Sequence, residues 1–149
     1  MPKLHRRLDL GAMKAHSALL VAVVIFAAGN IAAGSGSSEA QVFIDAHNAV
    51  RAAVQPPPGY AGAWTPVPPL AWSDEVAGAA QAWADRLRDS NKCALMHSDT
   101  RDGENLAAGK GMDAASAVKM WASERDKFRY SPQYAFDIPT GHYSQLVWR

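Results

Sequence analysis

AVKMWASERDKF, residues 117–128, has the spacing of an amphipathic helix that carries a glutamate within its apolar stripe. At about 100° per residue, one face collects Ala117, Trp121, Glu124 and Phe128. An unpaired charge in a protein core is strongly unfavourable, so Glu124 requires a cation, a histidine or a metal beside it. A second interpretation stays open, in which Glu124 reaches solvent at the stripe edge or pairs near Arg125 or Arg129.

The helix that carries Glu124 is predicted to begin after its cap, Asp113, and to extend to about Lys127. Two further helices are predicted upstream of it. A helix from Ser38 to about Val54 begins with a capping box, Ser38 and Gln41. Its predicted apolar face is Val42, Ala46, Ala49 and Ala53. Another helix begins after the cap Ser73, and its predicted buried stripe is Val76, Ala80, Trp83 and Leu87.

The last segment, HYSQLVW at residues 142–148, is rich in aromatic and β-branched residues and predicts a strand. With a period of two, one face of that strand would carry His142, Ser144, Leu146 and Trp148. His97 and Glu104 precede the helix of Glu124, in a polar segment without a clear period.

These residues supply two imidazoles and two carboxylates, His97, His142, Glu104 and Glu124, a set that can bind a divalent ion or share protons. Their separations match no compact zinc motif, and no H-E-x-x-H occurs. No G-x-S-x-G and no phosphate-binding G-x-x-x-x-G-K-S/T occurs either. Cys93 is interpreted as a structural thiol. The alternative is that Cys93 is a nucleophile that acts together with His97, four residues on.

The first 33 residues differ in charge from the rest of the chain. They hold four basic residues and one acidic residue, a net charge of +3, whereas the remaining eleven basic and thirteen acidic residues give −2. A basic start, the apolar run 18–28 and small residues after it predict a signal peptide, cleaved between about 30 and 40. An uncleaved membrane anchor is the alternative. We expect a linker at 34–40, a domain at 41–149 and no nucleic-acid partner.

Six segments, in order, resemble the CAP superfamily of cysteine-rich secretory, antigen-five and pathogenesis-related proteins. They are HNAVR at 47–51, PLAWS at 69–73, CALMHS at 93–98, GENLA at 103–107, WASE at 121–124 and GHYSQLVW at 141–148. The resemblance implies an α+β fold, a three-layer α-β-α sandwich with a small antiparallel sheet between helices. It also implies that His97, Glu104, Glu124 and His142 share a cavity, and that His47 is structural.

In the family a further strand with a cysteine usually follows the Trp148 strand. The resemblance therefore implies that the sequence is truncated after Arg149, and that the partner of Cys93 lies in the missing strand. We expect the Trp148 strand to present an open, apolar edge that lowers stability or promotes aggregation.

The resemblance implies a secreted, extracellular protein (periplasmic in a Gram-negative bacterium) without a membrane span after signal cleavage. We expect a non-enzymatic binding or defence module for a sterol, a fatty acid or a surface partner. The alternative is a zinc-dependent peptidase or esterase. In a hydrolase of this kind, His97 and His142 would ligate Zn²⁺, and Glu104 or Glu124 would act as general base on the bound water.

Overall fold

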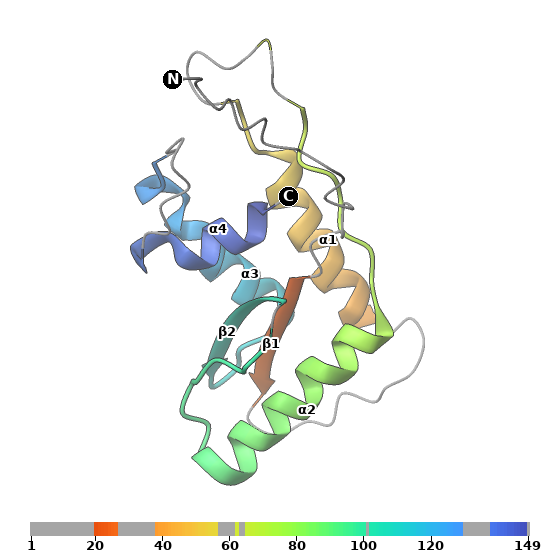
Figure 1. The fold of residues 1–149 in the computed structure, drawn as a ribbon, viewed down its shortest axis with the longest axis vertical. Coiled ribbons are helices and arrows are strands. Elements are labelled where there is room, and N and C mark those ends of the chain that lie inside the picture. The colour runs from red at the N-terminus through yellow and green to blue at the C-terminus, as the bar shows by residue number, and fades with distance from the viewer. Residues whose placement is uncertain are drawn as a thin grey trace, which may run out of the picture.

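A computed structural model describes residues 20–26, 38–56, 62, 65–100, 102–129 and 138–148 of the chain. Figure 1 shows its helices and strands. In chain order they are β1 (Leu20–Phe26), α1 (Ser38–Ala52), α2 (Asp74–Asn91), β2 (Gly103–Gly109), α3 (Ala114–Ala122), the 3₁₀ helices η2 (Ser123–Lys127) and η3 (Ile138–Thr140), and α4 (Gly141–Val147). This mixture of helices and strands confirms the α+β class.

Strand β2 lies between two clusters of buried side chains. Leu106 packs with Val76, Ala84 and Leu87 of α2. The next residue, Ala107, packs with a second cluster, which contains Ala117, Val118, Trp121 and Leu146 of α3 and α4, and Phe43, Ala46 and Val50 of α1. Successive side chains of a strand point to opposite faces. Helix α2 therefore covers one face of β2, and α1, α3 and α4 cover the other (Figure 1).

The described sheet has two strands and is parallel, whereas we expected an antiparallel sheet. Its register runs from Leu20 opposite Gly103 to Phe26 opposite Gly109. Strand β1 falls within the apolar run that the sequence assigns to the signal peptide. A continuous apolar, β-branched run is typical of a buried parallel strand, so the segment suits this position as well. The antiparallel pairing is therefore wrong for the strands that the structure describes, whereas cleavage of the leader and the three-layer sandwich remain predictions.

The rest of the predicted leader, residues 1–19 and 27–33, and linker residues 34–37 lie outside the described part of the chain. Residues 38–40, the end of the predicted linker, already belong to α1. Within the described ranges, no helix combines the length and the apolar character needed to cross a bilayer.

The predicted buried face of α1 is confirmed at Ala46 alone and is wrong at its other three positions. Val42 is exposed, as are Ala49 and Ala53. The face of α1 that packs against the core consists of five residues, Phe43, Ala46, His47, Val50 and Arg51. A count of apolar positions missed this face because two of its members, His47 and Arg51, are polar. The Gln41 side chain donates from Nε2 to Asp45 Oδ1 at 2.8 Å, one turn on, and the capping box with Ser38 remains a prediction.

The caps predicted for α2 and α3 are confirmed. Ser73 Oγ accepts from the Val76 backbone N–H at 3.4 Å, and Asp113 Oδ1 accepts from that of Ser116 at 2.7 Å. Hydrogen bonds from Ser116 also hold the pKa of the Asp113 carboxyl below its usual value. The predicted stripe of α2 is confirmed too, since Val76 and Leu87 are buried, and Ala80 and Trp83 pack against them. The third helix is shorter than predicted, because it tightens into η2 after Ala122.

The strand predicted at residues 142–148 is wrong, because Gly141–Val147 forms the helix α4. The buried residues of α4, Tyr143 and Leu146, are three apart, a spacing that puts both on one helical face but on opposite faces of a strand. Ser144 Oγ donates to the Thr140 carbonyl at 2.8 Å, four residues back. Strand preference depends on context, and packing against α3 overrides it here. The open strand edge expected at Trp148 is therefore not formed.

The C-terminal end of α2 suggests a stabilising substitution. Lys92 and Cys93 both have positive φ, 51° and 61°, a region that a side chain disfavours. Lys92→Gly is expected to raise the free energy of unfolding by about 0.5–1 kcal/mol, measured in urea. The control Lys92→Ala removes the same charge but keeps Cβ. An equal gain from both variants would show that the charge, and not the backbone, limits stability.

Candidate functional site

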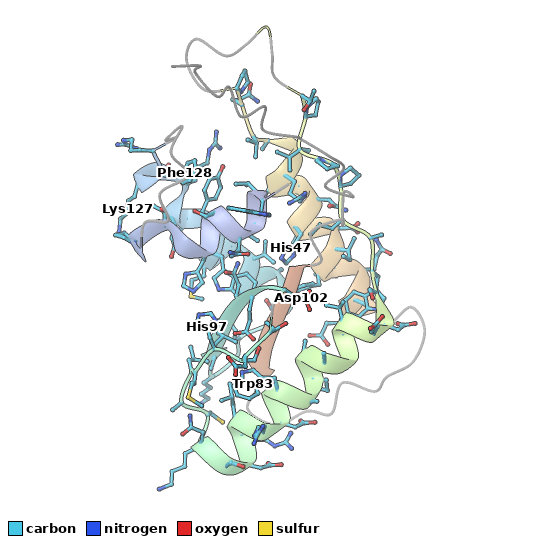
Figure 2. The ribbon with its side chains drawn as sticks, viewed as in Figure 1. His47, Trp83, His97, Asp102, Lys127 and Phe128 are labelled. Carbon is cyan, nitrogen blue, oxygen red and sulfur yellow. The ribbon has the colours of Figure 1, made fainter. Side chains whose placement is uncertain are left out.

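The four residues predicted to form the site come from separate elements. Glu104 is on β2, Glu124 is on η2 and His142 is on α4. His97 lies in the segment between α2 and β2, apart from the other labelled histidine, His47 of α1 (Figure 2). The structure joins the four side chains as two histidine–glutamate pairs.

The first pair is His97 and Glu104. His97 Nδ1 lies 2.5 Å from Glu104 Oε2. The carboxylate also accepts from the backbone N–H of Ser98, 3.1 Å from Oε2, and from its hydroxyl, 2.5 Å from Oε1. The Glu104 side chain is 4% exposed and that of His97 is 65% exposed. A carboxylate beside Nδ1 accepts a hydrogen bond from Nδ1–H, so the lone pair of the neutral imidazole lies on Nε2.

The second pair is His142 and Glu124. His142 Nδ1 lies 2.7 Å from Glu124 Oε1, and the other carboxylate oxygen accepts from the Tyr143 backbone N–H at 3.1 Å. The carboxylate thus satisfies a donor in the first turn of α4, which has no acceptor within the helix. Glu124 is partly buried, with its side chain 21% exposed, and its partner is a histidine. Here too Nδ1 is engaged, and Nε2 is left for another partner.

Three residues missed by sequence reasoning, Ser98, Asn105 and Trp121, hold these pairs. Asn105 Nδ2 donates to the His142 backbone carbonyl at 3.0 Å. Trp121 Nε1 donates to the Leu106 carbonyl at 3.2 Å, and its indole stacks on the His142 ring with centroids 6.3 Å apart and planes at 16°. The available signal was adjacency in sequence, because Ser98 follows His97 and Asn105 follows Glu104.

The four residues are not gathered into one metal-ligand cluster. In the described part of the chain, no three His, Cys, Asp or Glu side chains lie where they could jointly hold a metal ion. The donor chemistry nevertheless suits a metal, because each imidazole is oriented by a carboxylate on Nδ1, as metal-binding histidines commonly are.

Cys93 packs against the α2 cluster and has no disulfide partner among the described residues. Its predicted pairing with a cysteine in a later strand remains a prediction. The alternative in which His97 activates Cys93 also remains a prediction, because the bond of His97 Nδ1 to Glu104 leaves Nε2 open.

His47 lies in the core next to the second pair. It is fully buried, and its ring packs between Phe43, with centroids 4.3 Å apart, and Trp121, at 6.2 Å. Nδ1 donates to the Phe43 carbonyl at 2.8 Å, and Nε2 has no hydrogen-bond partner in the described structure. Burial lowers the pKa of His47 to about 4. His47 thus belongs to the packing beneath the site.

Comparison with known proteins agrees with the sequence motifs. The pattern of the cysteine-rich secretory protein family, CAP, matches residues 44–149. Pathogenesis-related protein 1A of Nicotiana tabacum is 42% identical over 112 residues, which are 73% of this chain and 59% of that protein. Pathogenesis-related protein 1 of Arabidopsis thaliana is 33% identical over 135 residues, 90% of this chain and 75% of that protein. A PR-1 type protein of Sambucus nigra is 39% identical over 115 residues, 73% of this chain and 60% of that protein.

This chain thus spans about three-fifths of the length of the tobacco protein. No solved structure matches it. The family pattern covers most of the chain, and it includes both histidine–glutamate pairs. The chain belongs to the cysteine-rich secretory protein (CAP) family.

Proposed function

We propose that this chain is a secreted, defence-type binding module whose ligand contacts are His97 and His142. Membership in the CAP family and likeness to pathogenesis-related proteins support an extracellular, defence-type protein. The observation that carries the site is that both histidines bond a glutamate through Nδ1, which leaves Nε2 for a ligand.

A divalent metal such as Zn²⁺ would be held by the Nε2 atoms of His97 and His142. Glu104 and Glu124 would orient the two rings and strengthen them as ligands. A bound metal would supply a positive charge that attracts an anionic group. The partner classes that we propose are a fatty acid, a sterol or an extracellular surface.

Binding is favoured over hydrolysis by the state of the two carboxylates. Glu104 accepts hydrogen bonds from His97 and from the backbone and hydroxyl of Ser98. Glu124 accepts from His142 and from the Tyr143 backbone. A general base must face the proton that it removes. Carboxylates engaged in this way are better suited to hold the histidines than to activate water.

Calorimetric titration of the chain with Zn²⁺ tests the site. His97→Ala and His142→Ala are each expected to weaken binding by about 10-fold or more, because each removes one of two nitrogen ligands. Asp102→Asn is the matched control, since it removes an exposed acidic side chain two residues before Glu104. Unchanged affinity in both histidine variants, or no Zn²⁺ binding by the wild-type chain, contradicts the metal proposal.

A second measurement separates the binding module from the hydrolase. The zinc-loaded chain is expected to take up a fatty acid or a sterol without turning over peptide or ester substrates. Turnover that disappears in both His97→Ala and His142→Ala would instead establish the hydrolase and reject the binding-only proposal.

A further inference from the structure

We propose that Asn105 is a positioning residue, which holds His142 in place and joins the two histidine–glutamate pairs into one unit. Asn105 is 1% exposed and lies in the middle of the buried part of β2. Its Nδ2 donates to the His142 backbone carbonyl at 3.0 Å. The consequence for ligand binding rests on the proposed function, whereas the positioning itself does not.

Three consecutive residues of β2 are connected to the two pairs, two of them directly and the third through Trp121. Glu104 bonds His97, and Asn105 bonds the backbone of His142. The third residue, Leu106, accepts through its carbonyl from Trp121, whose indole stacks on the His142 ring. One strand therefore sets the positions of two histidines that lie 45 residues apart in sequence.

The contacts of His142 divide between its ring and its backbone. Glu124 bonds Nδ1 and Trp121 stacks on the ring plane, so both restrain the side chain. The Asn105 amide bonds the peptide carbonyl in the first turn of α4, so it restrains the point from which that side chain projects. Without this bond, α4 can shift along α3, and the ring leaves the stack on Trp121.

An asparagine suits this role because a short amide can donate to a carbonyl from a buried strand. A carbonyl only accepts, so the bond requires the amide nitrogen. Leucine has a similar shape and no donor, and the carbonyl can keep its helical hydrogen bond. Asn105→Leu therefore removes the link with a small change in volume.

The matched control is Asn48→Leu. Asn48 is a partly buried asparagine whose Nδ2 also donates to a backbone carbonyl, that of Leu70, at 3.0 Å. Its Oδ1 accepts from the Leu70 backbone N–H at 2.7 Å. This bond ties α1 to the segment before α2, and it contacts neither pair. A purely structural effect of losing a buried amide appears in both variants, whereas a positioning effect appears only in the Asn105 variant.

The test is NMR of the histidine Cε1–H groups in the metal-free full chain. In the wild type, the His142 resonance is expected to be displaced by the ring current of Trp121. In Asn105→Leu this displacement is expected to shrink while the His97 resonance keeps its position. Asn48→Leu is expected to leave both resonances unchanged. An unchanged His142 resonance in folded Asn105→Leu overturns the proposal.

Hydrogen exchange in the wild-type chain keeps the test independent of whether the variants fold. One Asn105 side-chain amide proton is expected to exchange more slowly than those of the exposed Gln55. Equally rapid exchange at both side chains overturns the proposal.

Zn²⁺ titration then tests the consequence for binding. Asn105→Leu is expected to weaken binding by about 10-fold, as outer-shell changes commonly do, and Asn48→Leu is expected to leave it unchanged. If the wild-type chain binds no Zn²⁺, the metal part of the proposed function fails, and the metal-free spectra still decide the role of Asn105. If Zn²⁺ binds and Asn105→Leu does not weaken it, the coupling of the two pairs is rejected.

Discussion

Arg51→Met is expected to lower the free energy of unfolding by about 3–5 kcal/mol. Arg51 is 3% exposed, and its guanidinium donates to three backbone carbonyls. Nε lies 2.8 Å from Pro68 O, and Nη1 lies 2.8 Å from both Leu146 O and Trp148 O. These bonds tie α1 to the segment before α2 and to the end of α4.

The loss of stability is large because the three carbonyls are left without their hydrogen-bond donor when the guanidinium is removed. The last carbonyls of a helix have no partner within it, and the negative end of its dipole favours a cation. Methionine keeps most of the volume, so the change isolates the hydrogen bonds. The measurement is urea unfolding at pH 7.

The control for this prediction is Arg88→Met. Arg88 pairs with Asp85 and Asp89 on the exposed surface of α2, where solvent screens such pairs. This variant is expected to unfold at the wild-type urea concentration. Equal losses from both variants would mean that the buried carbonyl contacts of Arg51 contribute nothing beyond a surface arginine.

Acidification from pH 7 to pH 4 is expected to destabilise the fold by up to about 3 kcal/mol through His47 alone. The pKa of His47 is lowered from its ordinary value of 6.5 to about 4. Burial is the main cause, the hydrogen bond to the Phe43 carbonyl opposes it, and the nearby positive charge of Arg51 adds to it. Between pH 6.5 and about pH 4, His47 is protonated in the unfolded chain and neutral in the folded chain. Stability is therefore complete above about pH 6.5 and falls as the pH drops toward 4.

His47→Leu is the variant that isolates this effect. It removes the titrating ring together with the buried Nε2 that lacks a partner, and it keeps His97 and His142. Urea unfolding is measured for both proteins at intervals from pH 7 to pH 4. The difference in unfolding free energy between wild type and variant is expected to change by up to about 3 kcal/mol over this range. A constant difference would show that His47 does not control the acid response.

Much of the helical framework follows from local signals. Ser73 and Asp113 were predicted as caps because a short side-chain oxygen satisfies the first free N–H groups of a helix, and both make this bond. The stripe of α2 was also predicted, because its apolar spacing is regular. Each of these features depends on residues within one or two turns of one another, so the sequence contains the whole interaction.

Two local predictions failed where distant contacts outweigh local preference. The residues of α4 favour a strand, yet Tyr143 and Leu146 are buried at a helical spacing and Leu146 packs with residues of α3. Arg51 also donates to carbonyls at the end of α4. The buried face of α1 contains His47 and Arg51, which an apolar pattern cannot identify. Both are buried because aromatic rings and carbonyls from other elements surround them.

The sequence by itself determined the family, the α+β class and the need for a partner at Glu124, since a carboxylate in an apolar stripe cannot remain unpaired. Only the tertiary structure decided that His142 is this partner, that Glu104 bonds His97, and that Asn105 bonds the His142 carbonyl. These contacts join residues up to 37 positions apart. Hydrogen bonds form only within about 3 Å, and chain folding, which no local pattern encodes, sets those distances.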